Sequence, residues 1–366
     1  MKKNILSILF ALAMMPVISQ THQTENLLIV TMDGFRWQEF FNGADSSLFF
    51  NQRYTPDASR VSEFWNADSD QRREALLPFF WNVVAQQGQL YGNRNYGNKV
   101  SCANPYWFSY PGYSEMFTGV VDRHMASNRK VMNPNSNVLE FIHQQNEFEG
   151  KVAAFSTWDV IPYVLRTSYN GIHVNTMKGK AFNDSIISED TSQTDKDERC
   201  DESTFTAAFD FLKQQQPRVL FLSLDGTDEH SHAGRYADYL IYAHKADQMI
   251  SELWNWVQTQ ERYKDKTTLL VTTDHGRGKG RNSWKTHGRW AAGSNQIWMA
   301  VIGPDTPALG EMKTNAHYFQ KQTAKTAAAF LGLEYTHSSS AVGEMIYPMM
   351  MKQDHLTANK ETASAK

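Results

Sequence analysis

The chain has 366 residues, of which 41% are hydrophobic and 20% charged, so it can build a substantial core and is not a disordered polypeptide. Its formal net charge of −3 gives no basic surface for a nucleic-acid polymer. Its two cysteines are too few for a disulfide scaffold or a cysteine-rich zinc module. The sequence has no long apolar run beyond the N-terminus, which excludes a multi-span membrane protein.

The N-terminus has the pattern of a secretory signal peptide. Two lysines precede the apolar run 5–15, and a proline and then small residues follow it. The run is short for a bilayer span, and no cysteine follows it for lipid attachment. We therefore predict that residues 1–19 are removed and that the mature protein is exported, to the periplasm or the extracellular space, without a membrane anchor. An oxidising compartment permits a disulfide between Cys102 and Cys200, but the sequence does not decide whether it forms.

Five apolar runs recur along the chain, and polar residues follow each of them. Continuous apolar runs are typical of strands that are buried on both faces, as in parallel sheets. Helical candidates lie between the runs, so the pattern predicts an α/β layered domain with a mostly parallel sheet, which binds ligands at the C-terminal ends of its strands. The expected strands are Leu27–Thr31, Val152–Phe155, Val219–Leu224, Leu269–Thr273 and Ile297–Ile302, and the expected helices are Arg73–Gln86, Asn137–Gln145, Ser203–Gln215 and Tyr236–Gln258.

Two polar stretches interrupt this alternation. Residues 42–73 and 169–202 are expected to form excursions or a small cap over the site rather than separate domains. The polar tail 351–366 is expected to be disordered. The predicted organisation is therefore a signal peptide (1–19), one domain (20–350) with these two insertions, and the tail.

Aspartates and histidines follow three of the expected strands. An aspartate at a strand end is usually a cap, and a lone histidine is usually structural, so any one of them is weak evidence. Carboxylates mixed with imidazoles, without a thiolate, are a ligand set that suits catalytic zinc and leaves the metal open to substrate. Because six such residues meet at one edge of the predicted sheet, we expect a centre for two zinc ions. The candidate ligands are Asp33, Asp228, His232, Asp274, His275 and His287.

Ser109 is the candidate nucleophile. It precedes a Pro-Gly pair, and residues 112–119 are predicted to open a helix after a tight turn, so that the hydroxyl lies where backbone amides bind anions. Coordination to zinc lowers the pKa of a hydroxyl and makes it an attacking group. The alternative is that Ser109 only caps the helix, and Ser101 and Ser114 are rivals by composition.

The motifs also occur in a recognisable order. Asp33-Gly-Phe-Arg comes first, and Ser-Tyr-Pro-Gly-Tyr-Ser-Glu-Met-Phe-Thr-Gly follows at residues 109–119. The remaining motifs are Asp228-x-x-x-His232, Asp274-His275-Gly276 and His287-Gly288. The set resembles the nucleotide pyrophosphatase/phosphodiesterase branch of the alkaline phosphatase superfamily, whose nucleophile segment is Thr-Phe-Pro-Asn-His-Tyr-Thr-Leu-Val-Thr-Gly. The resemblance extends from about residue 26 to residue 335.

The resemblance implies a three-layer domain of the alkaline-phosphatase type, with the central sheet between helical layers. It implies that one zinc is held by Asp228, His232 and His287, and that the other, beside Ser109, is held by Asp33, Asp274 and His275. The two metals would clamp the attacking and leaving oxygens of an in-line displacement that passes through a phosphoserine. The expected protein is an exported two-zinc phosphoesterase for small anionic mono- or diesters, of undetermined oligomeric state.

The chain departs from the branch at several positions. It has Ser109 where the branch usually has threonine, and Gly112 where the branch has asparagine. The branch also uses an asparagine about twenty residues after the nucleophile to contact a phosphoryl oxygen; Asn128 and Asn133 are both candidates, and spacing does not choose between them. Two further residues near the third motif, Asp225 and His230, are interpreted as supporting or surface groups.

Two groups of side chains bear on the substrate. The cations Arg277, Lys279, Arg281, Lys285 and Arg289 form either a solvated basic loop or a funnel that concentrates an anionic substrate. The aromatic residues Tyr106, Trp107, Phe108, Trp284 and Trp290 are candidates for stacking on a base, a sugar or an aryl leaving group.

Two other functions are alternatives on the same scaffold. A sulfatase-like or phosphonate-cleaving hydrolase could use the same scaffold, although Tyr113 stands where the sulfatase motif requires arginine. A secreted glycan-binding protein without activity could retain the fold, but the presence of all six ligands and the hydroxyl disfavours it.

Overall fold

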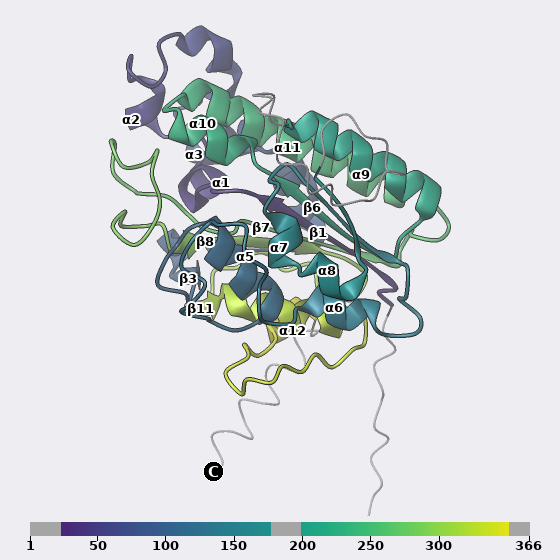
Figure 1. Cartoon of the computed structure of the whole chain (residues 1–366). Coiled ribbons are helices and arrows are strands. Elements are labelled where there is room, and N and C mark those ends of the chain that lie inside the picture. Colours follow the sequence, from purple (N-terminus) through teal and green to yellow (C-terminus); the bar gives the residue numbers. More distant parts are fainter. Residues whose placement is uncertain (1–22, 177–198, 351–366) are drawn as a thin grey trace, which may run out of the picture.

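The computed structural model describes residues 23–176 and 199–350 (Figure 1). In these ranges, helices cover both faces of a central eight-stranded sheet. The expected signal peptide, the C-terminal tail 351–366 and most of the expected insertion 169–202 lie outside the described residues. No helix of the described ranges combines the length and the apolar character that a membrane span requires.

The strands of the central sheet are, in spatial order, β10 (Gly310–Glu311), β2 (Gln89–Tyr91), β9 (Met299–Ile302), β7 (Thr267–Thr272), β1 (Asn26–Met32), β6 (Val219–Leu224), β4 (Val152–Ser156) and β5 (His173–Asn175). The five strands from β7 to β5 are parallel, whereas β9 is antiparallel to both of its neighbours. The sheet is therefore mostly parallel, as predicted. A smaller sheet contains β11 (Ala316–Phe319), β3 (Asn98–Ser101) and β8 (Gln296–Ile297).

The helices form two layers (Figure 1). One layer contains α1 (Trp37–Asn42), α3 (Ser69–Leu76), α9 (Asp201–Gln215), α10 (Gly226–His232) and α11 (Tyr236–Val257). The other contains α5 (Ser109–Thr118), α6 (Val138–His143), α7 (Ile161–Val164), α8 (Thr167–Asn170) and α12 (Thr323–Phe330). The remaining short elements are α2 (Ser46–Phe49), α4 (Ala85–Gln87), a π-helical turn at Phe80–Val84 and 3-10 turns at Ala58–Phe64, Arg94–Tyr96, Gln320–Gln322 and Tyr347–Met349.

Alternate side chains of β1 enter two separate cores. Leu28 and Val30 pack in the core that contains residues of α9 and α11. Leu27 and Ile29 pack in the core that contains residues of α5, α6 and α12. Because both faces of the strand are buried, the four consecutive positions from Leu27 to Val30 are all apolar, which explains the continuous run in the sequence.

Two expected elements are wrong in detail. The helix expected over 73–86 is interrupted because Pro78 disfavours a helical conformation at the residue before it; α3 ends at Leu76, and the π-helical turn follows. The strand expected over Ile297–Ile302 divides at Trp298 into β8 and β9, which belong to different sheets. Trp298 stacks on Phe40 with ring centroids 3.9 Å apart and is fully buried, so it anchors the crossing point between the sheets.

The segment 42–73 lies against α11 and the loop that follows β7. The backbone N–H of Tyr236 donates to the carbonyl of Tyr54 over 2.9 Å, and the ring of Tyr54 meets the edge of Trp284, with centroids 5.5 Å apart. This excursion therefore supports the loop between β7 and β8, which carries His287.

The registers of three parallel strands bring their carboxyl ends to one edge of the sheet. Met32 of β1 pairs with Leu224 of β6, and Thr31 pairs with Thr272 of β7. The residues that follow these strands, Asp33 among them, consequently meet at this edge.

Candidate active site

A sharp turn after β1 places the first motif at the carboxyl edge. Asp33 follows the strand directly, and Gly34 adopts a left-handed conformation with a φ of 60°. A Cβ atom on Gly34 would lie 2.7 Å from Oδ1 of Asp228, closer than such contacts allow. The backbone N–H of Gly34 donates to Oδ1 of Asp274 over 3.1 Å. Glycine is therefore required where the acids of three strands converge.

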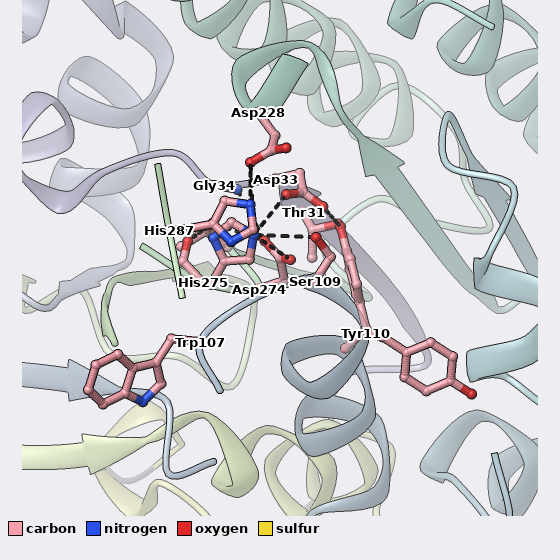
Figure 2. A network of polar contacts seen from close by, with 12 residues as sticks. Thr31, Asp33, Gly34, Trp107, Ser109, Tyr110, Asp228, Asp274, His275 and His287 are labelled. Atoms are coloured by element: carbon pink, nitrogen blue, oxygen red, sulfur yellow. Dashed lines mark hydrogen bonds and ion pairs between the residues drawn. The ribbon is translucent and has the colours of Figure 1, made fainter. Parts of the chain in front are cut away.

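Two buried carboxylate oxygens at this edge have no hydrogen-bond partner within the described part of the chain: Oδ1 of Asp33 and Oδ2 of Asp274. The other oxygen of Asp33 accepts a hydrogen bond from the Tyr113 hydroxyl over 3.0 Å. Nε2 of His275 lies 3.5 Å from the unpaired oxygen of Asp33 and 3.4 Å from that of Asp274 (Figure 2). Because an unpaired buried carboxylate oxygen is costly, these two oxygens suit a bound cation.

The orientation of His275 also suits a metal. Its Nδ1–H donates to the carbonyl of Gly276 over 2.9 Å, which leaves the Nε2 lone pair directed at the acids. The hydroxyl of Ser109 lies 3.3 Å from the same Nε2. One ligand atom each from Asp33, Asp274 and His275 lies within 4.8 Å of the other two. We call these three residues the inner group.

A second set of candidate ligands adjoins the inner group. Nε2 of His232 lies 3.2 Å from Oδ2 of Asp228, and Nε2 of His287 lies 3.8 Å from Oδ1 of the same residue. The Nε2 atoms of the two histidines are 2.8 Å apart. We call Asp228, His232 and His287 the outer group. The ring of His287 stacks on that of His275 with centroids 4.0 Å apart, so the two groups are neighbours.

The two additional residues of the third motif have different positions. A carboxylate oxygen of Asp225 lies within 4.8 Å of ligand atoms of Asp33 and Asp228, so Asp225 belongs to the acidic cluster. His230 instead accepts a hydrogen bond from Arg235 over 2.8 Å, and its ring packs on Tyr242. The interpretation as a supporting group therefore suits His230, whereas Asp225 is close enough to influence the charge of the centre.

Burial and neighbouring charges govern ionisation in the cluster. Burial, and then repulsion from Asp274, raises the pKa of Asp33 well above its ordinary value, and burial also raises the pKa of Asp274. Burial opposes ionisation of Asp228 as well, but the Arg277 guanidinium holds its pKa well below the ordinary value. Burial and a neighbouring imidazole lower the pKa of His287 to about 2, so this ring is neutral, as a metal ligand must be.

The first residue of α5 is Ser109, so the helix begins three residues earlier than the sequence predicts. Pro111 falls in the first turn, where its missing N–H costs nothing. A Cβ on Gly112 would lie 2.3 Å from the carbonyl oxygen of Asp274, so only glycine lets the helix approach this strand end. This close approach buries Ser109 beside the inner group.

The two candidate asparagines are placed differently. Oδ1 of Asn128 accepts a hydrogen bond over 3.0 Å from the backbone N–H of Tyr110, the residue after Ser109. Asn133 is buried and donates from Nδ2 to Oγ of Ser114 over 2.9 Å, within the body of α5. The geometry therefore favours Asn128 over Asn133 as the asparagine beside the hydroxyl.

The five basic residues between Arg277 and Arg289 differ in burial. Arg277 is buried and forms an ion pair with Asp228, so neither a solvated loop nor an open funnel describes it. The members with exposed or half-buried side chains are Lys279, Arg281, Lys285 and Arg289.

The aromatic candidates for substrate stacking also differ in burial and orientation. Trp284 is fully buried in the core, so the expected stacking role is wrong for this residue. Trp107 points away from the acids and histidines (Figure 2). Trp290 is 92% exposed, and the Arg289 guanidinium lies 5.9 Å from its ring centroid and 5.4 Å from that of Tyr106. Tyr106, Arg289 and Trp290 therefore connect the loop before α5 to the loop after His287.

Tyr113 has a role at the site that the motifs do not predict. Besides its bond to Asp33, the phenol contacts Oγ of Ser223 at 2.9 Å and Oγ1 of Thr31 at 3.2 Å. Tyr113 lies four residues after Ser109, and this spacing places both side chains on one face of α5. The spacing was the signal available in the sequence.

Arg36 of the first motif has a structural role. It is buried, forms an ion pair with Glu39, and donates to the carbonyl of Gly278 over 3.3 Å. It therefore ties the turn after β1 to the loop that follows β7.

The two cysteines are free thiols. Cys102 is buried, and its Sγ donates to the carbonyl of Asp274 over 3.4 Å, whereas Cys200 is exposed just before α9. The disulfide that the sequence left open does not form in this structure.

Comparison with known families gives one match that covers most of the chain. The sequence model of a family described as type I phosphodiesterase / nucleotide pyrophosphatase matches residues 46–331. A search of curated proteins by sequence gave no match. The matched range begins after Asp33, so the position of Asp33 at the site rests on the structure, in which it directly follows β1 at the carboxyl edge of the sheet.

Solved structures resemble the chain in fold. The lipoteichoic acid synthase LtaP from Listeria monocytogenes is 14% identical with a TM-score of 0.57, over 89% of this chain and 76% of that one. The phosphonate monoester hydrolase SpPMH from Silicibacter pomeroyi is 13% identical with a TM-score of 0.53, over 91% and 78%. The alkaline phosphatase PafA is 11% identical with a TM-score of 0.58, over 90% and 99%. The α/β sandwich is therefore of the alkaline-phosphatase type, as predicted.

Proposed function

The chain belongs to the type I phosphodiesterase / nucleotide pyrophosphatase family and is a phosphoester hydrolase; from this premise we propose that it is an exported two-zinc enzyme acting on small phosphate mono- or diesters through a phosphoserine. One observation carries the proposal. The unpaired oxygens of Asp33 and Asp274 face Nε2 of His275, and the hydroxyl of Ser109 lies 3.3 Å from that nitrogen.

The family depends on metal ions, and the donor atoms suit zinc. Carboxylate oxygens and neutral imidazoles without a thiolate are ligands that zinc takes in catalytic sites. The inner group would hold one ion and the outer group the other. When bound, the ions supply Lewis-acid stabilisation of phosphoryl oxygens and lower the pKa of a nearby hydroxyl.

Ser109 is the proposed nucleophile. Its Oγ forms a bond to phosphorus as the bond from phosphorus to the leaving oxygen breaks, and the serine proton passes to the departing alcohol by way of solvent. Water then cleaves the phosphoserine, which releases phosphate or a phosphomonoester and restores the hydroxyl. The position of Ser109 at the first turn of α5 supports this role, because helix N-termini favour anionic groups.

Side chains around the hydroxyl are proposed to hold the substrate. Asn128 is fixed by the backbone N–H of Tyr110, and its amide nitrogen would donate to a phosphoryl oxygen. Lys279, Arg281 and Arg289 are exposed on the loop after the metal motif, where they would attract an anionic ester.

Export is proposed from the sequence of residues 1–19. Mass spectrometry of the mature protein from an expressing bacterium should find the N-terminus at Gln20 in the periplasm or the medium. A full-length chain confined to the cytoplasm would contradict this part of the proposal.

The enzyme assignment is tested by metal analysis and a substrate panel. We expect about two zinc ions per chain after gentle purification, loss of activity on chelation and its return with zinc. The panel contains nitrophenyl phosphate, bis-nitrophenyl phosphate, a nitrophenyl phosphonate and nitrophenyl sulfate. The proposal requires that one of the two phosphate esters be turned over fastest; dominant turnover of the sulfate or the phosphonate would favour the alternative hydrolases.

A further inference from the structure

A buried arginine, Arg277, forms a hydrogen-bonded ion pair with Asp228 of the outer group. Arg277 is 1% exposed, and its guanidinium NH2 donates both to Oδ1 of Asp228 and, over 3.2 Å, to the backbone carbonyl of the same residue. Two bonds from one nitrogen to one residue fix where the carboxylate points. The oxygen that Arg277 binds is also the one that lies 3.8 Å from Nε2 of His287 and 3.9 Å from Nε2 of His275.

This contact makes the two groups electrostatically unequal. The inner group presents two buried carboxylates, each with one oxygen lacking a partner among the described residues, and no arginine or lysine forms an ion pair with them there. The outer group itself contains a single carboxylate, whose charge Arg277 balances, together with two imidazoles. Asp225 lies within 4.8 Å of ligand atoms of both Asp33 and Asp228, so its carboxylate is shared by the two groups and does not remove the difference between them. A divalent cation gains much more from the first arrangement than from the second, because charge interactions are strong in a buried site.

Solvent access adds to the difference. Asp33, Asp274 and His275 are all at most 1% exposed, whereas the side chain of His232 is 48% exposed. An ion in the outer group therefore exchanges with solvent more readily than one in the inner group.

We propose that Arg277 is a positioning residue that orients Asp228 and weakens the affinity of the outer group for a divalent cation, so that the inner group fills first and the outer ion exchanges. The inference rests on the proposed metal centre. It predicts that the outer group senses the concentration of free metal, since that group alone would empty when zinc is scarce.

Calorimetric titration of metal-free protein with zinc tests the inference. The native chain should bind zinc in two resolved steps. The Arg277→Gln variant, which removes the charge, should tighten the weaker step about tenfold or more and leave the tighter step within about twofold. The matched variant Arg277→Lys keeps the charge and should retain a weak second step. An unchanged or weaker second step in folded Arg277→Gln protein would overturn the inference.

The order of filling is tested without altering Arg277. One equivalent of cobalt added to the metal-free native chain should give an absorption spectrum that His232→Ala leaves unchanged and Asp274→Asn abolishes. The reverse dependence, or equal dependence on both residues, would overturn the inference while leaving the proposed function intact. Failure of the native chain to bind either metal would instead contradict the proposed function itself.

Discussion

The hydroxyl of Ser109 lies 3.3 Å from Nε2 of His275, although 166 residues separate the two in sequence. The contact depends on Gly112, because a side chain at that position would collide with the carbonyl of Asp274 and push α5 away from the strand end. A small residue inside a helix thus sets the distance between the proposed nucleophile and the proposed metal ligands.

We predict that Ser109→Ala lowers kcat by about 10³-fold or more, with fold and zinc content retained, because the attacking oxygen is lost. Ser114→Ala is the matched control on the same helix. It removes only the acceptor for Asn133 and should cost about 1 kcal/mol of stability with activity within a few-fold of native. Steady-state kinetics and urea unfolding measure both effects. An inactive Ser114→Ala variant together with an active Ser109→Ala variant would show that Ser109 is wrongly assigned as the nucleophile.

Tyr113→Phe should lower zinc affinity or activity about 10-fold to 100-fold, because Asp33 loses the donor that orients it. Tyr110→Phe is the control. Its phenol donates to the backbone carbonyl of Val131 over 2.6 Å, so the variant loses a comparable bond away from the acids. Zinc titration and kinetics on both variants should separate them; equal losses would mean that Tyr113 acts on folding alone.

The double variant Lys279→Ala, Arg281→Ala should reduce kcat/KM for anionic esters and flatten its salt dependence, because steering is screened over about 8 Å at physiological ionic strength. The effect should be largest for esters with additional negative charge, such as nucleotides, and smallest for an aryl phosphate ester whose leaving group is uncharged. Arg262→Ala with Lys264→Ala removes the same charges just before β7, at the opposite end of the strand from Asp274, and should have no such effect. Identical salt profiles for the native chain and the first double variant would show that the loop is only solvated.

Asp247 gives a prediction for stability, away from the proposed metal ligands. It is buried in α11, where it accepts backbone N–H groups of Phe79 and Phe80 over 3.0 and 3.1 Å, and burial raises its pKa to about 7. A raised carboxyl pKa stabilises the fold below the unfolded pKa of about 4, and this stabilisation is lost as the pH rises through about 7. The loss amounts to at most about 4 kcal/mol.

The control for this effect is Asp247→Asn, which cannot ionise. Urea unfolding at about pH 5 and about pH 8 should show a larger fall in the free energy of unfolding for the native chain than for the variant. Equal falls would mean that Asp247 ionises in the fold without cost.

The sequence predicted the edge of the sheet where the acids and histidines meet, because strands buried on both faces leave an unmistakable apolar run before each polar motif. It also predicted the helices from Ser203 and from Tyr236 to within two residues, since their apolar spacing is regular. What it could not predict depends on long-range packing. Arg277 resembles its basic neighbours in sequence, and only the fold reveals that it is buried against Asp228.

Two other differences between the predicted and the observed structure arise because the hydrophobic pattern does not show what a residue packs against. Trp284 stands in a polar loop but fills the core between the excursion 42–73 and α11, so its aromatic character serves packing. The apolar run through Trp298 reads as one strand because both of its halves are buried, although they join different sheets. Periodicity reports burial, and it does not report which partner covers a residue.

The most direct test of the account is to trap the covalent intermediate. The zinc-loaded protein is mixed with excess nitrophenyl phosphate, quenched in acid during turnover, digested and examined by tandem mass spectrometry. The account predicts the added mass of one phosphoryl group on the peptide that contains Ser109, localised to that side chain and absent from Ser109→Ala. A phosphoryl group on another residue of the native chain, or rapid turnover by folded Ser109→Ala, would contradict it.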